Sequence, residues 1–253
     1  MRRPALGRRT IVLYLLLQAI ILHAFSASVL AAGPATRPYV LHLPGVGGFS
    51  AVDRSLIAGL KAGGVDAEVR VYDWVDGHPG IPTLHDYQHN RAQAALVAKV
   101  IAARVAAYPR ERIVVTSHSG GGAMAVWALE DLPPGVQVDD VLLLATALSP
   151  GYDLSAALRH VRGHVYVFWS TGDELILGIG CRICGTMDGK STDAAGRVGF
   201  IQPPAADVEQ YRKLDQHPYS PDWAWLGNFG DHVGPMAAPF AKKILAPLVI
   251  GKQ

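Results

Sequence analysis

One short segment constrains the fold of this chain more than any other. Ser117-His118-Ser119-Gly120-Gly121-Gly122 stands directly between an apolar run over 112–116 and a second run over 120–130. The first run is β-branched and predicts a strand, and the second predicts a helix that stops before Pro133. The chain must therefore pass from strand to helix within very few residues. Such a turn needs small residues on both sides of its centre, and it lifts the Ser119 side chain above the end of the sheet.

Ser119 is therefore the first candidate for a chemical role. At the start of a helix, the macrodipole favours negative charge that develops near the serine oxygen, and the Gly120 N–H points to the same place. Two alternatives stay open at this point. The segment could be a glycine-rich loop with an ordinary N-cap serine, or a phosphate-binding loop. The Gly-Lys-Ser/Thr sequence that marks a phosphate loop does not follow.

The remaining chain alternates between strand-like and helix-like runs. Short apolar or β-branched runs predict strands, and longer periodic runs predict helices. Strands are expected over 39–43, 67–72, 112–116, 138–145 and 164–169, and helices over 51–62, 90–108, 120–130, 154–160, 206–214 and 235–248. This alternation predicts an α/β fold with a mostly parallel central sheet and helices on both faces. A chain of 253 residues, half of them apolar, can form it as one domain.

The first 32 residues form a separate segment, and 33–253 form the predicted catalytic domain. A basic stretch over 1–10 precedes an apolar stretch over 11–30 and small residues at 31–33, the pattern of a signal peptide. The apolar stretch is also about the 20 residues that a retained membrane anchor needs. Either reading places the folded domain outside the cytoplasm, as a secreted, periplasmic or envelope-associated protein, and only the anchor would attach it to a membrane.

Charge and cysteine content narrow the function classes. The chain has a formal charge of +2, but residues 1–32 hold four arginines and no acidic residue, so the remainder carries −2. That balance gives no reason to expect a nucleic-acid partner. The two cysteines, Cys181 and Cys184, are predicted to form a local disulfide in an oxidising compartment, with redox catalysis or half a zinc site as alternatives. We predict no cofactor and no metal.

Two later segments supply candidate partners for Ser119. The run 165–173 reads as a strand that ends in a Gly-Asp turn at Asp173, and His232 lies in a Gly-Asp-His loop just before the last predicted helix. With these residues the chain resembles the α/β-hydrolase family, in its lipase and esterase-like branch. The order Ser, acid, His is the order of that family. The resemblance covers roughly 39–248 and implies a Ser119–Asp173–His232 catalytic triad, in which Asp173 orients the imidazole that moves the serine proton.

Other residues could fill these roles. Glu174 is the nearest substitute for the acid and Asp153 a distant one, while Asp173 itself could simply form a turn. Six histidines precede Ser119, one of them within the first 32 residues, and two more precede the acid, so His217 is the only other late candidate for the base.

The resemblance also implies an oxyanion hole and pocket walls. The loop over 42–48 resembles the family's His-Gly-x-Gly loop, although Leu43 and Pro44 separate its histidine from its first glycine. The N–H groups of Val46 and Gly120 are the expected oxyanion donors. A clear cap domain is missing, so the loops over 73–90 and 175–200 are expected to form the pocket walls. Residues predicted to line the substrate site are Gly47, Trp74, His118, Tyr152 and Trp223.

The resulting expectation is a serine hydrolase that acts on a small carboxylic ester or lipid through an acyl-Ser119 intermediate. The same triad could serve an acyltransferase, a thioesterase or an amidase, and a non-catalytic binding protein could keep the fold. Neither substrate nor oligomeric state follows from the sequence.

Overall fold

The computed structural model describes residues 37–252, and within them six strands form a single sheet. Every neighbouring pair is parallel, in the order β2-β1-β3-β4-β5-β6. The strands are β1 (Tyr39–Leu43), β2 (Glu68–Val71), β3 (Ile113–His118), β4 (Asp140–Leu144), β5 (Val165–Trp169) and β6 (Leu214–Pro218). The predicted α/β fold with a parallel sheet is therefore confirmed.

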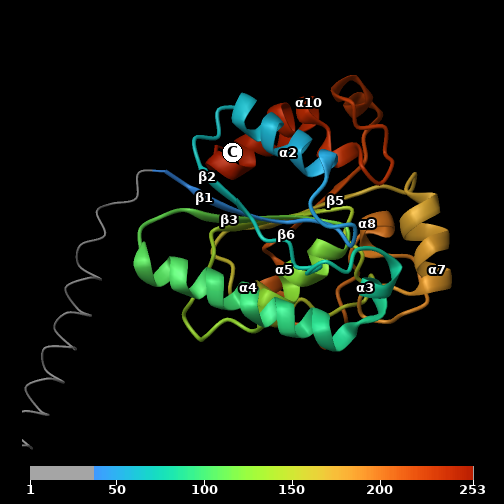
Figure 1. Ribbon diagram of the computed structural model, residues 1–253, viewed down its shortest axis with the longest axis horizontal. Helices are drawn as coiled ribbons and strands as arrows, with labels where there is room; N and C mark the ends of the chain where they lie inside the picture. Colours follow the sequence, from blue (N-terminus) through green and yellow to red (C-terminus); the bar gives the residue numbers. More distant parts are fainter. Residues whose placement is uncertain (1–36, 253) are drawn as a thin grey trace, which may run out of the picture.

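Helices cover both faces of the sheet (Figure 1). One face carries α2 (Ala51–Ala62), α10 (Ala238–Phe240), η4 (Ala241–Leu245) and α11 (Ala246–Ile250), and the other carries α4 (Tyr87–Ala107) and α5 (Gly120–Glu130). Each face has its own buried apolar cluster. None of the helices within 37–252 is long and apolar enough to cross a membrane.

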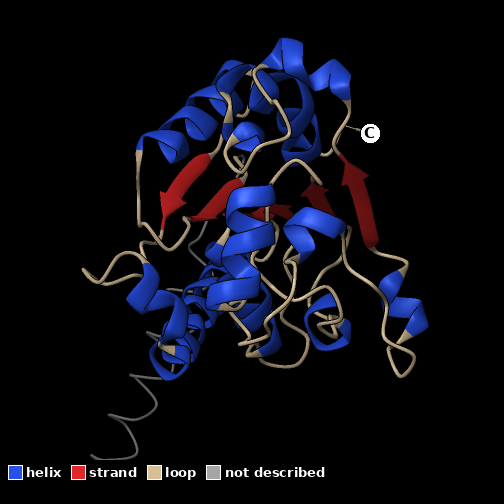
Figure 2. Cartoon of the chain, turned by 90° about the vertical axis from the view of Figure 1, so that its right-hand side faces the viewer, coloured by secondary structure: helices blue, strands red, loops and turns tan. Residues whose placement is uncertain are grey.

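Short elements and loops gather at one end of the sheet. Figure 2 views the molecule from the side where α7 and α8 lie in Figure 1, and helices and loops stand in front of the strands. The remaining elements are α3 (Ile81–His85), α6 (Ser155–Leu158), η1 (Glu174–Gly180), α7 (Cys181–Cys184), α8 (Ala195–Val198), α9 (Val208–Tyr211), η2 (Pro221–Leu226) and η3 (Gly234–Met236). The β4–β5 connection contains only the single turn of α6, as expected for a fold with a minimal cap.

Two predicted elements differ from the structure. The expected helix over 206–214 is only the short α9, and the strand β6 follows it. β6 was missed because it is an edge strand with no fully buried residue, so it lacks the apolar run of a buried strand. The expected terminal helix over 235–248 begins with the separate 3-10 turn η3 and then continues without a gap through α10, η4 and α11, with π-helical hydrogen bonds over η4. Pro235 and Pro239 stand in the first turns of η3 and α10, where a missing N–H costs least, and Pro247 follows the π-helical stretch.

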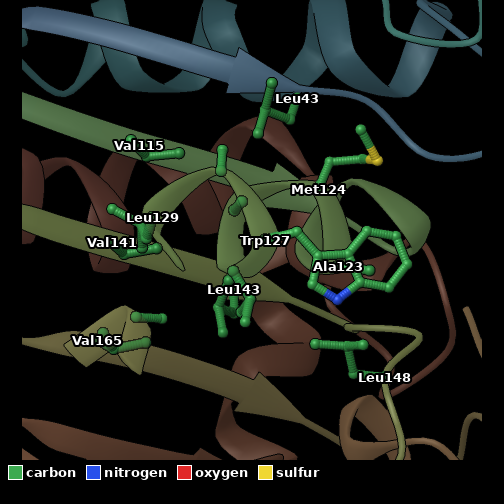
Figure 3. Close-up of a cluster of buried hydrophobic side chains, with 14 of the residues drawn as sticks. Leu43, Val115, Ala123, Met124, Trp127, Leu129, Val141, Leu143, Leu148 and Val165 are labelled. Carbon is green, nitrogen blue, oxygen red and sulfur yellow. The ribbon is translucent and has the colours of Figure 1, made fainter. Parts of the chain in front are cut away.

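The helix α5 is buried along almost its whole length. Every residue from Gly120 to Leu129 is buried, because the helix packs on the sheet and is covered by α4. Figure 3 shows its Trp127 and Met124 among side chains of the strands, including Val115 and Leu143. Burying one such side chain contributes roughly 1.5–3 kcal/mol. The sheet and α5 together form a rigid base for the turn that joins them.

The helix α2 approaches the C-terminal helices closely enough to exclude a side chain at one position. A Cβ placed on Gly59 would lie 2.3 Å from the carbonyl oxygen of Ala238 and 2.7 Å from the Cβ of Ala241. Both neighbours belong to packed helical segments, so neither can move aside cheaply.

We therefore expect Gly59→Ala to lower the free energy of unfolding by about 1–3 kcal/mol, measured by urea denaturation. The direction is informative because alanine is the better helix former by about 1 kcal/mol, so propensity alone would stabilise the protein. Gly151→Ala is the matched control, since a Cβ there has no neighbour within 4 Å. A Gly59→Ala variant as stable as the wild type would contradict the close approach.

Candidate active site

Ser119 occupies the sharp turn between β3 and α5. Its φ of 53° and ψ of −121° lie outside the regions that a residue with a side chain normally adopts. Such strain costs on the order of 1–3 kcal/mol and persists only where the surroundings enforce it. Ser119 is the N-cap of α5, yet its hydroxyl makes no capping hydrogen bond. The alternative of an ordinary N-cap serine therefore does not describe this residue.

The neighbours of Ser119 are small because backbone lies against them. A Cβ on Gly121 would lie 2.2 Å from the carbonyl oxygen of Leu43 and 2.4 Å from that of Pro44. On the other side of the turn, Ser117 is fully buried and its hydroxyl donates to the Leu142 carbonyl. The start of α5 is thus pressed onto the end of β1.

The structure brings the predicted acid and base together. His232 Nδ1 lies 2.6 Å from Asp173 Oδ2, although the two residues are 59 positions apart in the chain. Asp173 is only 2% exposed, and its other oxygen accepts a hydrogen bond from the Leu177 N–H at 3.2 Å. These contacts fix the orientation of the carboxylate, which in turn fixes the imidazole ring.

The alternative acids and base are engaged elsewhere. Glu174 pairs with Arg197, and Asp153 accepts hydrogen bonds from the backbone and hydroxyl of Ser155. His217 stacks on Phe168 with ring centroids 4.9 Å apart. None of these three side chains takes part in the His232–Asp173 pair.

His118 joins the serine turn to the loop that carries His232. Its Nε2–H donates to the His232 carbonyl oxygen at 3.0 Å, and the two ring centroids are 4.8 Å apart. The structure records no hydrogen bond between Ser119 and His232 themselves, so His118 is the direct link between their segments. Burial, and then the adjacent His232, lower the pKa of His118 to about 4. The ring is therefore neutral at pH 7 and acts as a donor at Nε2.

The two residues predicted to supply the oxyanion donors, Val46 and Gly120, are neighbours in the structure. A Cβ on Gly120 would meet Val46 Cγ1 at 2.7 Å, so these two residues are in contact. Neither the Val46 N–H nor the Gly120 N–H donates a hydrogen bond to another of the residues in 37–252. Gly47, the next residue of the loop, is exposed and has open space on its Cα side.

The predicted lining residues Trp74 and Tyr152 have other positions. Trp74 is completely buried, and its indole N–H donates to the Pro44 carbonyl at 2.7 Å, so it supports the oxyanion loop from behind. The Tyr152 hydroxyl bonds to Trp127 and Glu130, about two helical turns along α5 from Gly120. Burial and the Glu130 charge raise the pKa of Tyr152, which stays protonated. The Trp74 ring nevertheless lies beside the serine turn, 3.4 Å from where a Cβ on Gly120 would stand. Trp223, also predicted to line the site, packs on Phe240 and lines a small cavity together with Asp173.

The predicted disulfide is not formed in the structure, where Cys181 and Cys184 are free thiols. Cys181 packs into the main core while Cys184 is half-buried, so the two side chains of α7 lie in different surroundings. Burial raises the pKa of Cys181 to about 12, which disfavours a reactive thiolate.

Two supporting groups escaped the sequence analysis. Asn228 Oδ1 accepts a hydrogen bond from the Gly230 N–H at 3.0 Å and shapes the loop before His232. At the end of β1, His42 Nε2 lies 2.9 Å from Asp53 Oδ1, and both side chains are buried. Burial raises the pKa of Asp53, but hydrogen bonds from His42 and Ser50 outweigh it and lower the value overall. The position of Asp53 three residues into a helix after Ser50 was the one available signal, a capping box.

The fold and this geometry define a class: a parallel α/β scaffold with a strained serine after a central strand and a His–Asp pair at the same edge. A sequence profile of the alpha/beta hydrolase family matches residues 46–177, more than half of the chain. The chain belongs to the alpha/beta hydrolase family.

A solved structure gives the same fold. Lipase B of Aspergillus fumigatus is similar over 87% of this chain and 54% of its own, with a TM-score of 0.52 and 16% identity. This chain thus spans about half the length of that lipase. A hydrolase of the alpha/beta superfamily from Xanthomonas campestris pv. campestris matches over 85% of this chain and 99% of its own, at 16% identity and a TM-score of 0.49. A comparison with curated protein sequences gives no match.

The low pKa of His118 has a consequence for stability. The unfolded chain binds a proton at His118 below about pH 6.5, whereas the folded protein does so only below about pH 4. Stability is therefore lost as the pH falls from 6.5 to 4, by on the order of 3 kcal/mol from this residue. In His118→Gln, which keeps a donor but cannot titrate, we expect a smaller loss between pH 7 and pH 4 in urea denaturation.

His85→Gln, a change at an exposed histidine outside this network, is the matched control and should follow the wild type. An identical pH dependence in wild type and His118→Gln would show that His118 is not held neutral.

Proposed function

We propose that the protein is a serine hydrolase that cleaves carboxylic esters through an acyl-Ser119 intermediate. One observation carries the proposal. The His232–Asp173 pair, joined at 2.6 Å with its carboxylate buried, is tied by His118 to the strained turn that holds Ser119. A strained serine, an oriented imidazole and a buried carboxylate at one sheet edge are the parts that nucleophilic acyl transfer needs.

Each residue would have a separate task. The Ser119 oxygen attacks the ester carbonyl while His232 Nε2 takes the hydroxyl proton. Asp173, bonded to Nδ1, holds the imidazole in the required tautomer and stabilises its charged form. His232 then gives the proton to the leaving alcohol, and water repeats the sequence on the acyl-enzyme.

The oxyanion of each tetrahedral intermediate would be held by the Val46 and Gly120 N–H groups. Their contact through Val46 Cγ1 and the absence of another acceptor within 37–252 support this role. One such donor is worth about 10²–10³ in rate. The neutral state of His118 also fits the mechanism, because a charged ring 4.8 Å from His232 would oppose formation of the imidazolium.

We propose esters as the substrates because the fold is similar to that of Aspergillus fumigatus lipase B. Cleavage of a small ester or lipid needs no catalytic group beyond the residues named above. Thioesters, amides, or transfer to an alcohol instead of water would use the same residues. We also propose that the enzyme acts outside the cytoplasm. The segment that supports this, 1–32, lies outside the described residues.

A fluorophosphonate probe should label the folded protein at Ser119, located by peptide mass spectrometry. The probe reacts with an activated serine oxygen and its phosphoryl oxygen occupies the oxyanion position. Ser119→Ala should take no label. Absence of an adduct on Ser119 in the folded wild type would overturn the proposal.

His232→Ala should lower kcat for p-nitrophenyl acetate by about 10⁴-fold or more, because the serine loses its general base. The matched change His217→Ala removes the other late histidine and should leave kcat within a few-fold of the wild type. If His217→Ala lost kcat by this factor and His232→Ala kept it, the assignment of His232 as the base would be wrong. Circular dichroism of both variants checks that they are folded.

A further inference from the structure

The oxyanion loop, residues 44–49, lies directly against the nucleophile. A Cβ on Gly45 would lie 3.2 Å from the Ser119 Cβ. The next residue, Val46, contacts Gly120 on the other side of the serine. A small rotation of this loop would therefore move the Val46 N–H relative to the Ser119 oxygen, so the groups that hold the loop in place bear on the proposed reaction.

Two hydrogen bonds fasten the oxyanion loop to the segment over 73–80, between β2 and α3. The Trp74 indole N–H donates to the Pro44 carbonyl at 2.7 Å. The Gly80 N–H donates to the Val46 carbonyl, also at 2.7 Å. The loop is thus held from outside at its first residue and again at the residue that carries the proposed oxyanion donor.

A turn inside the oxyanion loop sets the direction of that donor. The Gly48 N–H donates to the Gly45 carbonyl at 2.9 Å. This carbonyl belongs to the same peptide group as the Val46 N–H, and in a planar trans peptide the two bonds point in opposite directions. The Val46 N–H is therefore directed outward from the turn. A displacement of Gly48 would release the Gly45 carbonyl and, with it, the direction of the Val46 N–H.

The Asp73 carboxylate holds the Gly48 end of this turn. Its Oδ2 accepts a hydrogen bond at 3.1 Å from the N–H of Phe49, the residue after Gly48. Gly48 lies against the same carboxylate, since a Cβ placed on it would be 3.2 Å from Oδ2 and 3.3 Å from Oδ1. Gly48 has a φ of 72°, a left-handed conformation that glycine adopts without strain. Asp73 is itself exposed, so its substitution removes no core packing.

The chain on the far side of the loop is held separately. The Ser50 N–H donates to Asp53 Oδ2 at 2.7 Å, and the other oxygen of Asp53 bonds to the buried His42. Loss of the Asp73 carboxylate would therefore loosen the turn without releasing Ser50 or Pro44.

Resting on the function proposed above, we propose that Asp73 is a positioning residue for the oxyanion hole. Its hydrogen bond to the Phe49 N–H keeps the turn closed and the Val46 N–H directed at the place where the oxyanion forms. Negative charge on the substrate oxygen develops only as the tetrahedral intermediates form. This alignment therefore serves kcat and not the binding of the ester.

The test measures kcat and KM for p-nitrophenyl acetate on the wild type, Asp73→Ala and Asp73→Asn. In Asp73→Ala we expect kcat to fall about 10–100-fold, because a misplaced donor loses part of the roughly 10²–10³ in rate that it contributes. KM should stay within a few-fold of the wild type, since acylation and deacylation both use the donor. Asp73→Asn removes the charge but keeps an acceptor oxygen, so it should restore most of kcat.

Three controls separate positioning from a general loss of structure. Asp66→Ala, at an exposed carboxylate that pairs with the exposed Arg37, should match the wild type. The urea denaturation midpoint of Asp73→Ala should stay at the wild-type value. The fluorophosphonate probe should still label Ser119 completely in Asp73→Ala, but more slowly, because its phosphoryl oxygen occupies the oxyanion position.

An unchanged kcat in Asp73→Ala, with Ser119 labelled at the wild-type rate, would overturn the role of Asp73 and leave the hydrolase proposal intact. A loss of kcat that Asp73→Asn shares in full would also overturn it, because the charge and not the hydrogen bond would then be responsible. A rise in KM at constant kcat would overturn it by placing Asp73 in substrate binding. A wild type that takes no label at Ser119 and hydrolyses no ester would overturn both proposals.

Discussion

The contact between the start of α5 and the end of β1 is the constraint on which the site depends. Gly121 lies so close to the carbonyl oxygens of Leu43 and Pro44 that no side chain fits between them. This approach brings the loop after β1 against Gly120, next to Ser119 in its strained conformation. The buried surface of α5 and the sheet supplies the stabilisation that offsets this strain. The packing of α5 on the sheet therefore also supports the geometry of the site.

Most of the fold could be predicted because its central strands are buried on both faces. Strands such as β3 and β4 appear as uninterrupted apolar runs, and a parallel sheet needs helices between them. β6 escaped prediction because an edge strand carries polar residues that have no such pattern. The C-terminal helix shows a different limit. Periodicity indicated a regular helix, but it did not show the π-helical stretch over Ala241–Leu245 that precedes Pro247.

The sequence predicted those site residues that stand in short motifs at the ends of strands or the starts of helices. Ser119, Asp173 and His232 each follow a strand or precede a helix in a recognisable turn, and the structure places the last two in contact. The lining residues were less predictable, because the facing of a side chain in a long loop depends on tertiary contacts. The Trp74 indole N–H donates to the Pro44 carbonyl, and the His118 Nε2–H donates to the His232 carbonyl. Sequence alone gave no sign of either partner.

The link between His118 and His232 also bears on how such an enzyme can diversify. The loop that carries His232 is held by contacts of His118 and Asp173 with His232 itself, and by Asn228 just before it. Residues 182–193 make no hydrogen bond to Asp173 or His232. Changes of length or sequence in that stretch are therefore expected to leave the contact between His232 and Asp173 in place.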